Sequence, residues 1–150
     1  MIIETRRFGE IEISEEQDII QMVGGLPGFE DAKKFILLNH DADSLFKWLQ
    51  AVENPELAFV VMEPFIFCPD YHFDLSDDEI AELELTKPEE SVVLTVLSVP
   101  EDPKKITANI KAPIVINRTK RRGKQIILNN EAYPVKYYLF LQEERCQGGR

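Results

Sequence analysis

The stretch 107–117 (TANIKAPIVIN) constrains the fold of this chain more than any other. Apolar residues recur on both sides of Pro113, as they do in β-strands. Proline donates no hydrogen bond to a neighbouring strand and holds the preceding residue extended, so it belongs at an edge, a strand start or a bend. We therefore predict two short strands that meet at a corner. Ile114 and Ile116 should face one side of a sheet and Val115 the other.

The rest of the chain also has the pattern of short strands separated by turns. Apolar or alternating segments recur about every ten residues along the chain. These segments are 2–5, 10–13, 18–23, 35–39, 45–52, 57–63, 91–99, 124–128 and 135–141. The pattern predicts a mainly β protein, a small antiparallel β-barrel or sandwich with one or two short helices.

Two segments between the predicted strands carry local signals. Ser76 and Glu79 have the spacing of a helix capping box, and acidic residues fill the first turn, so we predict a short helix over 77–83. The segment 24–30 (GGLPGFE) holds three glycines and a proline. It predicts a tight turn with positive φ angles, from which Leu26 and Phe29 reach into the core.

Length and charge limit the possible functions. The 150 residues fit one domain, 1–141, followed by a flexible tail, 142–150. The net charge of -10 argues against direct binding of nucleic acid and favours a basic partner protein. There is no apolar run of membrane-spanning length, so we expect a cytoplasmic protein without membrane contact. Cys68 and Cys146 lack metal-site spacing and are expected to be free thiols.

One constellation resembles a metal site. Asp70, His72 and Asp74 alternate, so on a strand their side chains would share a face and could bind a divalent cation. A metal-dependent hydrolase is therefore the alternative function. Against it, a surface turn is naturally rich in Asp and His, and the sequence has only two histidines and no GxSxG turn. We predict no metal and no catalytic residue.

Two charged segments and one aromatic residue allow either a structural or a binding role. The segment 118–124 carries five positive charges, and we interpret it as a solvated hairpin turn rather than a phosphate-contact loop. The segment 74–84 carries six acidic residues and no basic one; it is either a solvated helix face or a surface that attracts a basic protein. Trp48 and Gln50 share one face of their strand. We expect this face to pack in the core rather than to present Trp48 as an exposed interface anchor.

Six stretches of the sequence gain significance from their order and spacing. They are GLPGFE (25–30), FILL (35–38), LQAVENPELAFVV (49–61), PDY (69–71), TANIKAPIVIN (107–117) and GKQIIL (123–128). In this order and spacing they resemble the FliW family of bacterial flagellar assembly factors. The segments 2–5 and 10–13 alternate about Gly9 and predict an opening hairpin. The resemblance extends from this hairpin to Tyr137 and Tyr138, which is nearly the whole chain.

The resemblance implies a barrel-like protein that is not an enzyme, needs no cofactor and binds two proteins alternately. One partner is flagellin, and the other is the translational repressor CsrA. Flagellin awaiting export occupies the factor; once flagellin is secreted, the freed factor captures CsrA and lifts repression of flagellin translation. The acidic charge agrees with this, because an RNA-binding repressor needs a basic surface.

For the partner interface we predict three exposed segments. They are the turn 50–55, the corner 69–71 and the acidic helix 77–84. The candidate binding residues are Gln50, Glu53, Asn54, Pro55, Asp70, Tyr71, Asp77, Asp78 and Glu82. Without a partner, we expect the chain to be a monomer.

Overall fold

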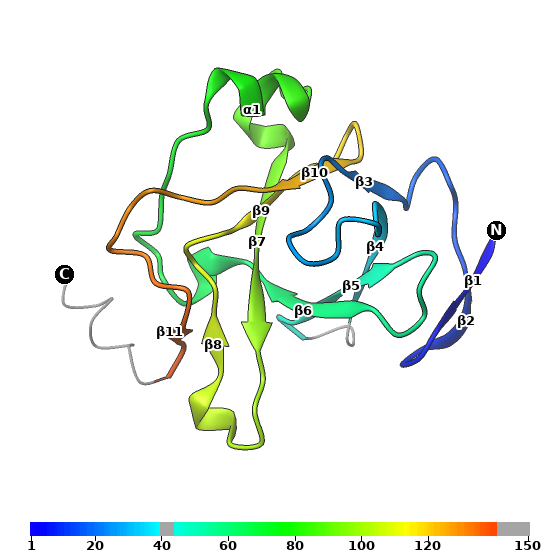
Figure 1. Cartoon of the computed structure of the whole chain (residues 1–150), viewed down its shortest axis with the longest axis horizontal. Helices are drawn as coiled ribbons and strands as arrows, with labels where there is room; N and C mark the ends of the chain where they lie inside the picture. The colour runs from blue at the N-terminus through cyan, green and yellow to red at the C-terminus, as the bar shows by residue number, and fades with distance from the viewer. Residues whose placement is uncertain (40–43, 141–150) are drawn as a thin grey trace.

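The computed structural model describes residues 1–39 and 44–140, and its strands form a barrel (Figure 1). The barrel strands are Ile20–Met22 (β3), Lys34–Asn39 (β4), Lys47–Ala51 (β5), Ala58–Met62 (β6), Ser91–Ser98 (β7), Ile114–Asn117 (β9) and Arg122–Gln125 (β10). They are ordered β7-β6-β5-β4-β3-β10-β9, and β9 pairs again with β7 to close the ring. The prediction of a mainly β chain and a small barrel is confirmed.

Further elements surround the barrel. They are the strands Ile2–Thr5 (β1), Gly9–Glu12 (β2), Thr107–Ala108 (β8) and Tyr137–Tyr138 (β11), the helix Asp77–Glu82 (α1), and the 3-10 turns Pro64–Ile66 (η1), Pro88–Glu90 (η2) and Pro103–Lys105 (η3). β1 and β2 form the predicted N-terminal hairpin, and β8 joins one end of β7 to β11. The predicted tail 142–150 and Cys146 lie outside the described residues.

One pair of barrel strands departs from the prediction of an antiparallel sheet. β3 and β10 run parallel, whereas the other neighbouring pairs in the ring are antiparallel. The reason is geometric. Strands around a closed ring can alternate in direction only if their number is even, so a seven-stranded ring must contain at least one parallel pair.

Apolar residues form one cluster inside the barrel and two outside it. The interior cluster includes the fully buried Phe35, Leu49 and Leu94. One outer cluster lies between the N-terminal hairpin and the outer face of β4 and β5, and contains Ile3 and Ile36. The other outer cluster includes Leu97 of β7 together with Leu83, Ile106 and Leu128, which lie outside the barrel strands.

The stretch 107–117 pairs with β7 along its whole length except for a bulge between β8 and β9. Leu97 lies three positions after Leu94 on β7. Their partners, Ala108 and Ile114, lie six positions apart, so three extra residues loop out between β8 and β9. The two predicted short strands are present on either side of Pro113, but the prediction that they meet at a corner is wrong, because both run antiparallel to β7 and only the bulge separates them. Ile114 and Ile116 lie in the interior cluster and Val115 in an outer one, which confirms the predicted faces.

The bulge loop 109–113 is held by hydrogen bonds on consecutive residues. The carbonyl of Ile110 accepts from the Tyr71 hydroxyl, that of Lys111 from the Leu128 N–H, that of Ala112 from the Gln125 side chain and that of Pro113 from the Ile126 N–H. The side chain of Asn109 accepts from the N–H groups of Lys111 and Ala112. Because buried carbonyls that lack partners are costly, these bonds make the bulge a rigid part of the scaffold.

The glycine-rich turn caps one end of the barrel, and it differs from the prediction at one residue. Leu26 is 3% exposed and lies in the interior cluster, as predicted. Phe29 does not reach the core: it is 44% exposed and packs edge-on against Phe59, with ring centroids 5.5 Å apart. The predicted positive φ angles occur at all three glycines; at Gly25, an added Cβ would come within 2.8 Å of the Glu30 backbone.

Candidate protein-binding surface

The corner after β6 is built around Tyr71. The chain turns twice there, with the Cys68 N–H bonded to the Pro64 carbonyl and the Tyr71 N–H bonded to the Cys68 carbonyl. The Tyr71 side chain is 2% exposed, its hydroxyl donates to the Ile110 carbonyl at 2.7 Å, and burial raises the pKa of the phenol. The expectation that Tyr71 belongs to an exposed corner is wrong, because its side chain ties this corner to the bulge loop. Asp70 is exposed.

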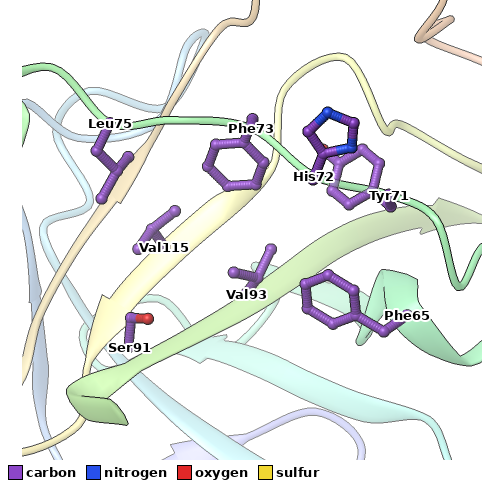
Figure 2. A pocket seen from close by; sticks show the side chains of 8 residues that line it. All are labelled: Phe65, Tyr71, His72, Phe73, Leu75, Ser91, Val93 and Val115. Carbon is purple, nitrogen blue, oxygen red and sulfur yellow. The ribbon is translucent and has the colours of Figure 1, made fainter. Parts of the chain in front are cut away.

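After Tyr71 the chain crosses the outer face of β7 and β9, and we call residues 71–76 the crossing segment (Figure 2). Burial alternates along it as in a strand. The inward side chains are those of Tyr71, Phe73 and Leu75. The N–H of His72 donates to the Tyr133 hydroxyl at 3.1 Å, and that hydroxyl also lies 3.2 Å from the His72 carbonyl, to which it can donate. Both backbone groups of His72 therefore point to the same side, as in an extended chain.

A hollow of about 230 Å³ lies between the crossing segment and the sheet. Figure 2 shows Phe73 and Leu75 pointing from the segment toward Val93 of β7 and Val115 of β9, with Phe65 at one end. The other lining residues are Tyr71, His72 and Ser91. Phe65 is 44% exposed. Since most of the lining is apolar, the hollow can accept an apolar side chain from another molecule.

A second, larger cleft of about 720 Å³ shares His72 with the first. Its lining comes from the corner, the bulge loop and the segment before β11. The lining residues are Cys68, Asp70, His72, Ile110, Asn130, Glu131, Ala132, Tyr133, Pro134 and Tyr137. Asp70 and Glu131 are acidic, and none of the described residues that line the cleft is a lysine or an arginine. The corner around Tyr71 therefore carries negative charge beside both the hollow and the cleft.

Helix α1 follows the crossing segment and begins with the predicted capping box. The Ser76 hydroxyl accepts from the Glu79 N–H at 3.1 Å, and the Glu79 carboxylate accepts from the Ser76 N–H at 2.8 Å. Asp77 and Asp78, both predicted binding residues, are exposed in the first turn. There they complement the helix dipole and remain accessible to a partner.

The other end of α1 is held against β10 by basic residues. Lys124 pairs with Glu82 at 2.7 Å, and Arg122 donates to the Glu82 carbonyl at 2.8 Å and lies 3.5 Å from the Glu84 carboxylate. Glu82, a predicted binding residue, is thus engaged within the chain. The unpaired acidic charge of α1 is concentrated near its first turn, at Asp77 and Asp78.

Most basic side chains of the segment 118–124 also bond to other groups of the protein. Arg118 donates to the Glu89 carbonyl and Arg121 to the Asp18 carbonyl, in addition to the contacts of Arg122 and Lys124 with α1. β9 and β10 pair across residues 118–121, and Arg122 and Lys124 at the end of the segment already belong to β10. These contacts support the interpretation of a hairpin turn over that of a phosphate-contact loop.

Asn117, which is not among the predicted binding residues, connects these elements. Its side chain is fully buried, donates to the carbonyls of Leu83 and Glu84, and accepts from the N–H groups of Thr119 and Lys120. It therefore fixes the end of α1 to the β9–β10 turn. An asparagine directly before a charged turn is the sequence signal that could have suggested this role.

The turn between β5 and β6 lies in a different part of the molecule from α1 (Figure 1). Glu53, Asn54 and Pro55 are exposed, as predicted. Gln50 is 1% exposed, and its amide donates within the turn, for example to the Asn54 carbonyl at 3.1 Å. Its burial agrees with the expected core face of the strand, and its assignment to the exposed interface turn is wrong. Trp48, on the same strand face, is half-buried, with the guanidinium of Arg7 lying 4.1 Å from its ring centroid.

The three residues of the alternative metal site are not arranged as ligands. Asp70, His72 and Asp74 are all exposed, and Nδ1 of His72 lies 3.0 Å from the backbone carbonyl of Asp70. Among the described residues, no three His, Cys, Asp or Glu side chains are grouped so that they could hold a metal ion. The geometry gives the hydrolase alternative no support.

Comparison with known proteins identifies the family. Residues 2–139 match the family described as FliW protein. This chain belongs to the FliW family. The flagellar assembly factor FliW of Caldicellulosiruptor saccharolyticus is 46% identical over 139 residues, which cover 93% of this chain and 90% of that protein. The FliW of Bacillus licheniformis is 45% identical over 136 residues, covering 91% and 94% respectively.

Solved structures agree with the FliW assignment. A crystal structure of the flagellar assembly factor FliW matches this one with a TM-score of 0.87 and 41% sequence identity, over 93% of this chain and 97% of the other. The resemblance seen in the six sequence stretches is therefore confirmed. FliW is a flagellar assembly factor rather than an enzyme. No helix among the described residues is long and apolar enough to span a membrane.

Proposed function

We propose that this flagellar assembly factor works in the cytoplasm by binding flagellin and the translational repressor CsrA in alternation. Flagellin that awaits export occupies the protein. Export of flagellin frees it to capture CsrA, and repression of flagellin translation is then lifted. The protein is a monomer between these two complexes, and it contacts neither nucleic acid nor membrane.

The observation that carries the proposal is an acidic surface beside an apolar hollow. Asp70, Asp74, Asp77 and Asp78 are exposed and, within 1–39 and 44–140, form no ion pair with a basic side chain. The hollow next to them is lined by Phe65 and other apolar residues. Apolar anchors surrounded by charge are typical of protein–protein interfaces. A repressor that binds RNA presents the complementary positive charge.

Electrostatic repulsion explains how the protein can oppose RNA binding without covering the whole RNA site. A body with a net charge of -10 that is docked on the repressor repels approaching phosphates. This repulsion weakens as salt shortens the Debye length, which is about 8 Å at physiological ionic strength. RNA displacement from the CsrA complex should therefore decrease at high salt. Displacement that is independent of salt at constant occupancy would contradict this mechanism.

Pull-down of purified flagellin and CsrA by this protein tests the proposal directly. The wild-type protein should retain each partner separately, and added flagellin should release CsrA. Asp78→Lys should weaken capture, because it reverses a charge at the exposed first turn of α1. Glu53→Lys tests the β5–β6 turn in the same way. If the wild-type protein retains neither partner, the proposal fails.

The loop between β7 and β8 offers a matched control. Glu101 is exposed in that loop, which projects from the barrel on the side opposite α1 (Figure 1). Glu101→Lys changes the net charge by the same amount as Asp78→Lys. If both variants reduce binding equally, only the overall charge matters, and the surface around α1 is not the binding site.

A further inference from the structure

The crossing segment has backbone groups that form no hydrogen bond with any other residue that the structure describes. Among the described residues, the N–H and carbonyl groups of Phe73, Asp74 and Leu75 take part in no hydrogen bond. The segment nevertheless has strand-like alternation of burial, and its neighbour His72 has both backbone groups directed at Tyr133. An extended segment with free backbone groups is a template for pairing with another chain.

The direction of the free groups follows from strand geometry. In an extended chain, the N–H and carbonyl of one residue point to the same edge, and those of the next residue point to the opposite edge. Since His72 faces Tyr133, the backbone groups of Phe73 and Leu75 face away from Tyr133. The side chains of the same two residues line the 230 Å³ hollow. One edge of the segment thus combines free backbone groups with an apolar pocket.

The charge around this edge indicates the chemistry of its partner. Asp70 and Asp74 are exposed on the segment or next to it, and Asp77 and Asp78 follow at the start of α1. Within 1–39 and 44–140, no lysine or arginine lines the hollow. A complementary peptide would therefore carry basic residues on either side of an apolar one.

From these observations we propose that the crossing segment binds an extended peptide of the partner protein by strand addition. The peptide pairs with the backbone groups of Phe73 and Leu75, places one apolar side chain in the hollow, and directs lysine or arginine toward the neighbouring aspartates. The inference rests on the proposed function, because it assigns a binding mode to the partner-binding surface of that function.

Amide hydrogen exchange of the full chain tests the pairing without any substitution. In the free protein the amides of Phe73 and Leu75 should exchange fast, since no described residue accepts a hydrogen bond from them. In the complex with purified flagellin or CsrA, at least one of the two partners should slow both amides by about tenfold or more. The amide of Asp74, which faces the other edge, should change less.

Filling the hollow gives a second test, with a control on the same strand. Ser91 lines the hollow at one end of β7, whereas Ser98 is exposed at the other end. Ser91→Phe should weaken binding of that partner by roughly 30-fold, the loss expected when a hot-spot contact is removed. Ser98→Phe should leave binding unchanged. Thermal unfolding of both variants establishes that they are folded.

The outcomes separate this inference from the proposed function. If a partner binds the wild-type protein but both amides keep exchanging fast, or if Ser91→Phe folds and binds like wild type, strand addition is wrong while the proposed function stands. If neither flagellin nor CsrA binds the wild-type protein, both fail. Slowed exchange at Phe73 and Leu75 together with loss of binding in Ser91→Phe supports strand addition.

Discussion

The bulge loop 109–113 and the crossing segment are both irregular and contact each other through Tyr71. They differ in how many of their backbone groups form hydrogen bonds. In the bulge loop, four consecutive carbonyls, from Ile110 to Pro113, accept hydrogen bonds. In the crossing segment, three consecutive residues after His72 make none among the described residues. We call the bulge loop the closed region, because its carbonyls are already hydrogen-bonded. We call the crossing segment the open region, because its backbone groups can still bond to a partner.

This difference teaches that a distinctive sequence motif does not always mark a binding site. The stretch 107–117 contains the most recognisable motif of the chain, but its side chains and backbone groups are used to hold the barrel together. The crossing segment has a plain composition and lies beside the hollow. A polar backbone that is already bonded has little left to offer a partner, whereas an extended, unbonded one can pair at low cost.

The largest effect on stability is expected at the end of β9, the strand that follows the bulge loop, where Asn117 is fully buried. Asn117→Ala removes four hydrogen bonds and leaves buried carbonyls of the α1 end without donors. We expect a loss of about 3 kcal/mol in the free energy of unfolding, measured by urea denaturation. Asn129→Ala, at an exposed position, is the matched control and should change stability by less than about 0.5 kcal/mol. Equal effects would show that Asn117 is not a connecting residue.

A smaller loss is expected at the contact between the two regions. Tyr71→Phe keeps the ring but removes the donor to the Ile110 carbonyl. The free energy of unfolding should fall by about 1–2 kcal/mol, because this carbonyl is then buried without its partner. Tyr133→Phe, which removes a hydroxyl at an exposed contact, should cost less. The reverse order in urea denaturation would contradict the role of Tyr71 as the anchor of the bulge loop.

In the open region, binding rather than stability should respond. Leu75→Ala shortens a half-buried side chain that lines the hollow, so its effect on unfolding should stay near 1 kcal/mol or below. Capture of flagellin or CsrA should weaken about tenfold, as measured by titration calorimetry. Ile127→Ala, which shortens a side chain that is 65% exposed, is the control. Unchanged binding in Leu75→Ala would remove the hollow from the interface.

The smallest equilibrium effect is expected from the acidic helix. The double variant Asp77→Asn, Asp78→Asn should alter stability by less than about 1 kcal/mol, because both side chains are exposed. Its main consequence should be slower association with CsrA at low salt, since exposed charges mainly steer encounter. Stopped-flow measurements at two ionic strengths check this. A change confined to the dissociation rate would contradict a steering role.

Much of the fold could be predicted because it depends on local patterns. Alternation at Ile114, Val115 and Ile116 gave the faces of β9, and the spacing of Ser76 and Glu79 gave α1. The parallel pair β3–β10 could not be found this way, because it follows from the number of strands in the closed ring. Periodicity describes each strand but does not count those that close a barrel.

The candidate site was harder to predict, because burial of polar residues depends on distant parts of the chain. Gln50 and Tyr71 looked like surface residues, but each satisfies backbone carbonyls in an irregular segment. Glu82 looked like a free acid until β10 brought Lys124 to it. Asp77 and Asp78 are exposed as predicted, since a short capped helix presents its first turn to solvent.

Native-state amide hydrogen exchange of the free protein tests the central contrast most directly. The amides of Phe73 and Leu75 should exchange at nearly the rate of an unstructured chain. Those of Ile126 and Leu128, which donate to the bulge loop, should be protected close to the level set by global unfolding. Strong protection of Phe73 and Leu75, or fast exchange at Ile126 and Leu128, would contradict the division into an open and a closed region.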